Sequence, residues 1–156
     1  MKSLMRKMGR AAVSVVNFES MNRVPLMPQL REVRGEIVPG MENVWYEYVP
    51  TTYDASHPLP LVVQLHGGGS DGKRWANITV WHELAETNGL IVIYPNSPDY
   101  ECWACNARDI QYVFDLIEHV CQKYAVDRSR IYIQGMSNGD QMTLAFTMAH
   151  PEILAA

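Results

Sequence analysis

The strongest constraint on the fold of this 156-residue chain is the regular alternation of short apolar runs with helical patterns. The runs have the length and composition of strands buried on both faces of a parallel sheet, and they occupy residues 61–65, 90–94 and 131–133. Each is followed by a segment with apolar side chains at helical spacing: residues 75–88, 107–124 and 138–149. This alternation predicts βαβ units, and therefore a doubly wound α/β domain with a mostly parallel sheet.

The first 40 residues lack this pattern. Their prolines and scattered charges predict an N-terminal arm, partly flexible, with the domain occupying residues 41–156. Basic residues precede a short apolar run within Met1–Val16, as in a targeting signal, but Asn17-Phe18-Glu19 follows where a cleavage site needs small residues. We therefore expect a cytoplasmic protein, with secretion as the alternative.

The C-terminal end of the pattern is a helix, with no strand after it. A closed, doubly wound domain needs further strands at this point. We therefore expect residues 41–156 to be the N-terminal portion of a domain that is incomplete at the C-terminus.

The composition excludes two classes of partner. An apolar fraction of 47% and a charged fraction of 19% are ordinary for a globular protein. The net charge of −4, with no cluster of basic residues beyond the N-terminus, gives no surface for nucleic acid. No apolar stretch has the length of about 20 residues that a membrane-spanning helix needs. We expect neither nucleic acid nor membrane as a partner.

A catalytic motif joins the third strand to its helix. In Gly135-Met136-Ser137-Asn138-Gly139, the two glycines allow a sharp turn and a close approach of strand and helix. Ser137 then lies at the apex of the turn, above the carboxyl ends of the strands, where open α/β sheets bind ligands. This context predicts that Ser137 is a nucleophile. The N–H of Asn138, at the helix start, is the predicted first donor to an oxyanion.

The second donor is expected from the loop after the first strand, His66-Gly67-Gly68-Gly69. Bare glycine backbone lets a carbonyl oxygen come close, and Gly68 is the preferred donor, with Gly69 as the alternative. His66 is expected to order this turn rather than to take a proton. His66, Gly69 and Trp103 are further predicted to border the substrate cleft.

A series of motifs carries a family resemblance. In chain order it comprises Leu65-His66-Gly67-Gly68, Tyr94-Pro95-Asn96, Cys102-Trp103, Arg108-Asp109-Ile110, the segment from Val126 to Tyr132, and Gly135 to Gly139. Over roughly residues 42–156 this series resembles the polyhydroxybutyrate depolymerase and feruloyl or acetyl-xylan esterase group of α/β-hydrolases. The resemblance implies a serine-type carboxylic ester hydrolase. It would act through an acyl-enzyme on a small-molecule or polymer ester, with no metal or organic cofactor.

Two departures from that family stand out. Asp140 replaces a residue that is commonly small, and its charge would disfavour an oxyanion unless it points away. The family's triad Asp and His follow the nucleophile by many residues, and nothing in this chain matches them. The five histidines do not offer the geometry of a base, since the triad order in this fold is Ser, then Asp or Glu, then His. As given, the chain is expected to hydrolyse esters feebly or not at all.

Two other classes of function compete with this interpretation. Cys102-Trp103-Ala104-Cys105 lies between a strand and a helix, the setting of a thioredoxin-like redox motif. The alternatives for this motif are two plain loop cysteines or a local disulfide. A non-catalytic remnant that binds a partner is the third class. Asp109, which follows this motif, could orient the oxyanion loop or act only as a favourable charge at the helix N-terminus.

Overall fold

A computed structural model of the chain describes residues 30–79, 81–99 and 101–155. The candidate targeting segment, Met1–Val16, lies outside the described residues. So does most of the predicted N-terminal arm. None of the helices within the described ranges is long and apolar enough to cross a membrane.

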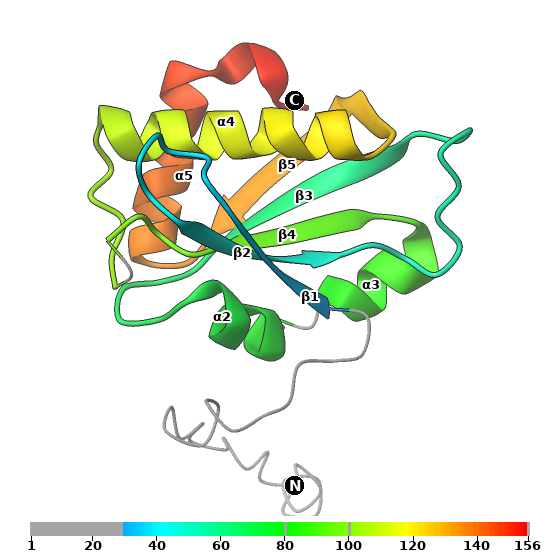
Figure 1. The fold of residues 1–156 in the computed structure, drawn as a ribbon, viewed down its shortest axis with the longest axis horizontal. Coiled ribbons are helices and arrows are strands. Elements are labelled where there is room, and N and C mark those ends of the chain that lie inside the picture. The colour runs from blue at the N-terminus through cyan, green and yellow to red at the C-terminus, as the bar shows by residue number, and fades with distance from the viewer. Residues whose placement is uncertain (1–29, 80, 100, 156) are drawn as a thin grey trace, which may run out of the picture.

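A single five-stranded sheet forms the centre of the molecule (Figure 1). Its strands are β1 (Leu30–Gly35), β2 (Asn43–Tyr48), β3 (Leu59–Leu65), β4 (Ile91–Pro95) and β5 (Val126–Gly135). They lie in the order β1-β2-β4-β3-β5. The inner strand β3 pairs in parallel with both β4 and β5, whereas β2 is antiparallel to β1 and to β4.

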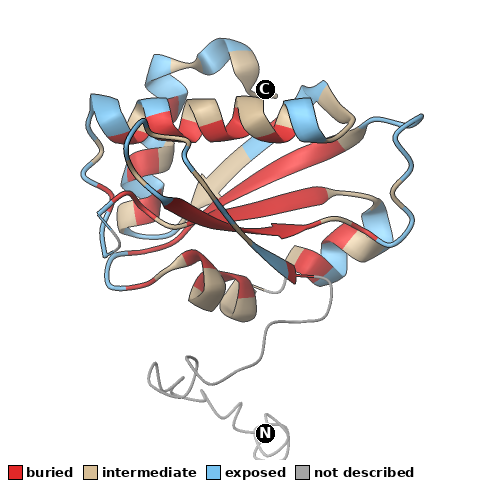
Figure 2. Ribbon diagram, viewed as in Figure 1, coloured by how far each residue is buried: buried red, intermediate tan, exposed pale blue. Residues whose placement is uncertain are grey.

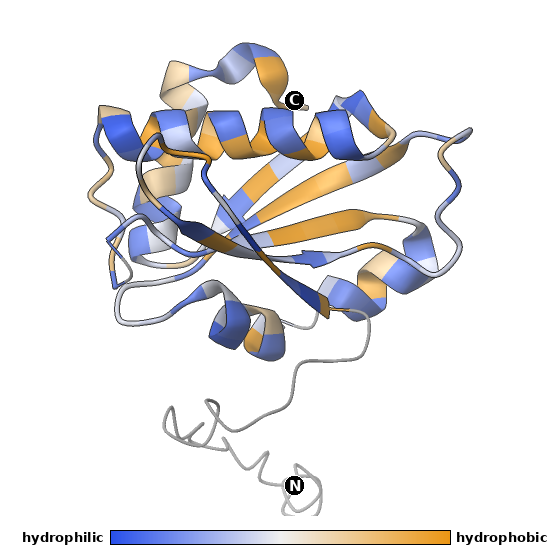
Figure 3. Cartoon of the chain, in the orientation of Figure 1, coloured by the Kyte–Doolittle hydropathy of each residue, from blue (hydrophilic) through white to orange (hydrophobic). Residues whose placement is uncertain are grey.

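Helices cover both faces of this sheet (Figure 1). One face carries α4 (Ala107–Lys123) and α5 (Asn138–Ala149), and the 3₁₀ turn η1 (Pro151–Ile153) follows α5. The other face carries α2 (Gly72–Thr79) and α3 (Trp81–Asn88). Figure 2 shows the central strands buried between these layers, and Figure 3 shows the same strands as the most hydrophobic part of the molecule.

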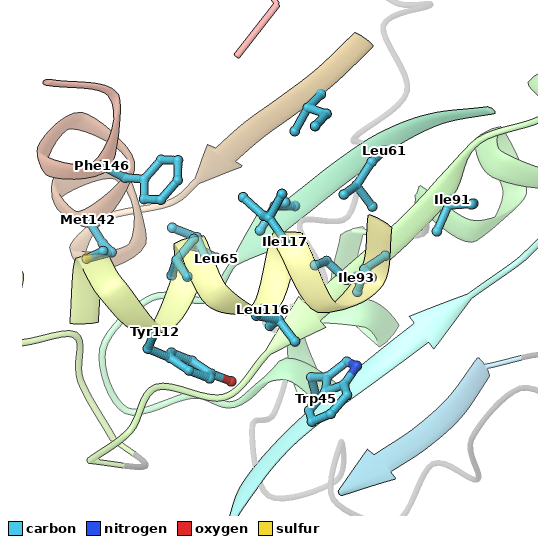
Figure 4. Close-up of a cluster of buried hydrophobic side chains, with 14 of the residues drawn as sticks. Trp45, Leu61, Leu65, Ile91, Ile93, Tyr112, Leu116, Ile117, Met142 and Phe146 are labelled. Carbon is cyan, nitrogen blue, oxygen red and sulfur yellow. The ribbon is translucent and has the colours of Figure 1, made fainter. Parts of the chain in front are cut away.

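The alternation of side chains along β3 divides the core between the two faces. Leu61 and Val63 pack into the cluster beneath α4 and α5, whereas Val62 packs into the cluster against α2 and α3. Figure 4 shows the larger cluster, in which Ile117 of α4 and Phe146 of α5 meet the strands. Burial of each large apolar side chain contributes about 1.5–3 kcal/mol, so both helical layers are firmly seated on the sheet.

The sheet extends further toward the N-terminus than the sequence pattern predicts. β1 lies inside the segment predicted to be an arm, and all of its residues pair with β2, from Leu30 opposite Tyr48 to Gly35 opposite Asn43. The prediction failed because β1 is an outer strand. Its charged side chains face solvent and leave no run of apolar residues to identify it.

Two other boundaries differ from the prediction. The helix expected over residues 75–88 is found as α2 and α3, with residue 80 outside the described residues. The first of these helices begins at Gly72, three residues before the predicted start. The third strand is longer than expected, because β5 begins at Val126, where polar residues precede its apolar centre.

Candidate active site

The turn between β5 and α5 is tightly constrained by close packing. A side chain on Gly135 would place its Cβ 2.3 Å from the carbonyl carbon of Gly139. A Cβ on Gly139 would lie 2.4 Å from the Leu65 oxygen and 2.6 Å from the His66 oxygen. Only glycine fits at either position, so the close approach predicted from the sequence is present.

Ser137 occupies the apex of this turn in a strained conformation. Its backbone has φ 56° and ψ −116°, a region that residues with a side chain rarely adopt. Strain of this kind costs on the order of 1–3 kcal/mol and persists only where the surrounding structure enforces it. Here the enforcement comes from the two glycines and from α5, whose first backbone hydrogen bonds run from Asp140 and Gln141 to the Ser137 oxygen.

Two backbone amides beside Ser137 are free. Within the described residues, neither the N–H of Asn138 nor that of Gly68 donates a hydrogen bond to the protein. The two residues are close together, since a Cβ on Gly68 would lie 3.8 Å from the Asn138 Cβ. A Cβ on the neighbouring Gly67 would likewise lie 3.8 Å from the Ser137 Cβ. The glycine loop therefore runs directly alongside the apex of the turn.

Gly69 does not share this property. Its N–H donates to the Glu101 oxygen at 2.7 Å, and its φ of 72° is in the left-handed region that favours glycine. The alternative prediction, in which Gly69 is the oxyanion donor, is therefore wrong in this conformation. The amide is already used to hold the loop.

His66 orders the glycine loop from within the protein. The side chain is fully buried, its Nδ1 lies 2.8 Å from the Gly67 oxygen, and its Nε2 accepts a hydrogen bond from the Ser97 N–H at 3.1 Å. Because Nε2 accepts, Nδ1 carries the proton and the ring is neutral. Burial lowers the pKa of His66, which favours that neutral form.

Trp103 supports the same loop through a buried side chain. Its side chain is 2% exposed, and its Nε1–H donates to the His66 oxygen at 3.1 Å. Its ring stacks on Tyr112, with ring centroids 6.4 Å apart. The side chains of His66 and Trp103 are both buried, and the role of His66, Gly69 and Trp103 in bordering a substrate cleft stays a prediction.

Two polar side chains hold the segment around Trp103, and their roles were not fully anticipated. The Asn138 side chain accepts from the Trp103 N–H at 2.6 Å and donates to the Trp103 oxygen at 3.0 Å. The buried Asp109 carboxylate accepts from the amides of Ala104 at 2.6 Å and Cys105 at 3.2 Å. Asp109 thus orients this segment in addition to lying in the first turn of α4. Sequence order gave no signal for the Asn138 contact, since 35 residues separate the partners.

No histidine of the chain lies at Ser137 in a position to act as its base. His150 caps the far end of α5 and contacts Phe114 and Phe146, while His119 packs edge-on against Trp45. The others are the buried His66, His82 on α3 and the exposed His57. Asp140 is exposed at the start of α5. Among the described residues, no three His, Cys, Asp or Glu side chains gather where they could hold a metal ion.

The two cysteines of the CxxC motif are unpaired in this structure. Cys102 is exposed and Cys105 is partly buried, and neither forms a disulfide. Burial, with a smaller contribution from the nearby Asp109 carboxylate, raises the pKa of the Cys105 thiol. A redox CxxC motif needs a lowered thiol pKa, so the environment of Cys105 does not favour the thioredoxin-like alternative.

The sheet topology and the strained serine turn together define the class of protein, which is an α/β-hydrolase. Comparison with known families gives the finer assignment. The family profile described as Esterase PHB depolymerase matches residues 45–156. The chain therefore belongs to this family.

Relatives of known sequence and structure agree with this assignment. The chain is 31% identical over 121 residues to feruloyl esterase B of Neurospora crassa, covering 71% of this chain and 41% of the relative. Acetylxylan esterase A of Emericella nidulans is 30% identical over 122 residues, covering 72% of this chain and 40% of the relative. The solved acetyl xylan esterase from Aspergillus awamori superposes with a TM-score of 0.72 and 25% identity, covering 81% of this chain and 49% of that one. The chain thus spans about two fifths of the length of these curated relatives.

Proposed function

We propose that residues 1–156 form the nucleophile-bearing part of a serine-type carboxylic ester hydrolase. In this proposal the Ser137 hydroxyl attacks the carbonyl carbon of an ester, the alcohol leaves, and water then releases the acyl group from Ser137. The substrate is a small-molecule or polymer ester. Relatives named feruloyl esterase and acetylxylan esterase support this substrate class.

The observation that carries the proposal is the combination of strain and free amides at one point. Ser137 is held at φ 56°, and the two amides that lack partners in the described residues, those of Asn138 and Gly68, lie beside it. Preorganised N–H donors of this kind stabilise the negative oxygen of a tetrahedral intermediate, and the loss of one costs about 2.7–4 kcal/mol. The arrangement fits an oxyanion hole and has no evident purpose in packing.

None of the five histidines, all of which lie in the described residues, is placed to activate Ser137. An added base can therefore test the nucleophile directly. Imidazole in solution is small enough to approach an exposed hydroxyl and has the pKa of a catalytic histidine. A fluorophosphonate reports the reaction, since attack forms the serine O–P bond, expels fluoride and passes the hydroxyl proton to imidazole.

We expect the fluorophosphonate to label Ser137, and imidazole to accelerate this labelling in a concentration-dependent way. Ser137→Ala should abolish the label. Ser56→Ala, which removes an exposed serine hydroxyl on a distant loop, is the matched control and should leave the rate unchanged. Peptide mapping by mass spectrometry locates the adduct. Equal labelling of Ser56 and Ser137, or an undiminished rate in Ser137→Ala, would contradict the proposal.

A further inference from the structure

The two amides assigned to the oxyanion come from different parts of the fold. Asn138 begins α5, whereas Gly68 lies in the loop after β3. Their relative position is therefore set by whatever joins these two elements. A misplacement of about 1 Å at a catalytic group can lower a rate about 10²-fold, so this connection matters for the reaction.

We propose that the side chain of Asn138 is a positioning residue that fixes the distance between the two oxyanion donors. The inference rests on the proposed function, because it assigns a purpose to contacts around the same site. It concerns the side chain alone. The backbone N–H of Asn138 keeps its separate role as a donor.

The first link is a reciprocal pair of hydrogen bonds between Asn138 and the backbone of Trp103. Oδ1 accepts from the Trp103 N–H at 2.6 Å, and Nδ2 donates to the Trp103 oxygen at 3.0 Å. Among the short side chains, only a carboxamide offers one acceptor and one donor side by side. Two bonds to one residue fix its orientation as well as its position.

The second link runs from Trp103 to the glycine loop. The Trp103 Nε1–H donates to the His66 oxygen at 3.1 Å, and its buried ring lies 5.4 Å from the His66 ring. Two positions earlier in the same segment, the Glu101 oxygen accepts from the Gly69 N–H at 2.7 Å. The segment 101–103 therefore holds the glycine loop on both sides of Gly68.

The two links form a continuous path from one donor to the other. It begins at the Asn138 side chain, passes through the backbone and indole of Trp103, and ends at the residues that flank Gly68. The remaining contact of the Asn138 side chain is a longer one, from Nδ2 to the Gln141 Oε1 at 3.3 Å within α5. That contact joins no second element, so Gln141→Ala is a matched control.

The test uses the chain as it exists and two independent measurements. The first is the NMR signal of the Trp103 indole N–H, which reports its hydrogen bond to His66. The corresponding signal of Trp45, whose Nε1–H donates to the buried Glu47 at 2.8 Å, serves as an internal reference for the fold. The second is the rate at which Ser137 reacts with a fluorophosphonate in the presence of imidazole.

We expect Asn138→Ala to shift the Trp103 indole signal, to leave the Trp45 signal in place, and to slow labelling of Ser137 about 10²-fold. Trp103→Phe keeps a smaller aromatic ring in the core and removes the indole N–H donor, and it should slow labelling in the same way. Because both changes break one path, the double variant should be no slower than the slower single variant. Gln141→Ala should alter neither measurement.

Several outcomes would overturn this inference. An unmoved Trp103 signal and an unchanged rate in Asn138→Ala would do so, as would single effects that multiply in the double variant. Should Asn138→Ala not fold, Asn138→Asp serves the same test, since the carboxylate keeps the acceptor and loses the donor. Absence of label on Ser137 in the unmodified chain contradicts the proposed function instead, so the two failures are distinguishable.

Discussion

The turn around Ser137 and the glycine loop at residues 66–69 lie side by side, but different forces hold them. The turn is fixed by steric packing of backbone: Gly139 fills the space where a side chain on Gly135 would lie, and the Leu65 and His66 carbonyl groups fill that of a side chain on Gly139. The glycine loop is fixed by partners distant in sequence: Ser97, Glu101 and Trp103. One half of the site is thus held by close packing of backbone atoms, and the other half by hydrogen bonds to Ser97, Glu101 and Trp103.

The largest expected effect comes from breaking the close packing of the turn. Gly139→Ala would place a Cβ 2.4 Å from the Leu65 oxygen, where only backbone could give way. We expect a loss of unfolding free energy at or above the upper end of the about 1–3 kcal/mol that overpacking costs. Urea denaturation followed by circular dichroism measures it.

Gly69→Ala is the matched substitution in the other half of the site. Nothing lies within 4 Å of the Cβ it would add, so only the strain of a left-handed residue is expected, about 1–2 kcal/mol. Equal losses in the two variants would show that packing does not distinguish the turn from the loop.

The same difference explains what could be predicted from the sequence. The turn could be predicted because its motif is short and continuous, with two glycines around a serine between a buried strand and a helix. The central strands could also be predicted, since burial on both faces leaves a continuous apolar run in the sequence. Outer strands have no such signature, and β1 was therefore missed.

The supports of the glycine loop could be predicted only in part. The ordering role of His66 follows from its place in the loop, but its Ser97 partner is 31 residues away. Trp103 was predicted to border the substrate because it follows a strand in the sequence. The sequence does not show in which direction its ring points. The contacts that bury it depend on tertiary packing, which a single sequence does not display.

A second prediction addresses the glycine loop through His66. His66→Ala removes the acceptor for the buried Ser97 N–H. An unpartnered buried amide costs about 1–3 kcal/mol, and the cavity left by the ring adds to this loss. His57→Ala, at an exposed histidine, is the control and should leave the free energy of unfolding unchanged in urea denaturation. A loss of unfolding free energy in His57→Ala but not in His66→Ala would show that His66 does not stabilise the glycine loop.

The neutral state of His66 also predicts a dependence on pH. Burial holds the pKa of His66 in the folded protein below the value of about 6.5 expected when unfolded. The unfolded chain therefore binds more protons as the pH falls below about 6.5, and the folded state loses stability. The slope reaches at most about 1.4 kcal/mol per pH unit for one such proton.

His66→Gln tests this dependence because glutamine can still accept a hydrogen bond and does not titrate. The difference in unfolding free energy between the parent chain and this variant should shrink as the pH falls from 7.5 toward 5.5, within the range set by the lowered pKa. A difference that stays constant over this range would mean that His66 is not held neutral by the fold.

The smallest expected effect separates the esterase interpretation from the redox alternative. Cys105 lies next to the Trp103 segment, but its Sγ makes only a weak contact, 3.7 Å from the Trp103 oxygen. Cys105→Ser should therefore leave the labelling rate of Ser137 within about twofold, or about 0.4 kcal/mol.

Burial and the Asp109 carboxylate raise the pKa of the Cys105 thiol, so its alkylation should be slow at pH 7 and accelerate only under alkaline conditions. Peptide mapping after iodoacetamide treatment at several pH values measures this rate for Cys105 alone. Rapid alkylation at neutral pH would indicate a stabilised thiolate, and with it a redox role for the segment that we assign to holding the glycine loop.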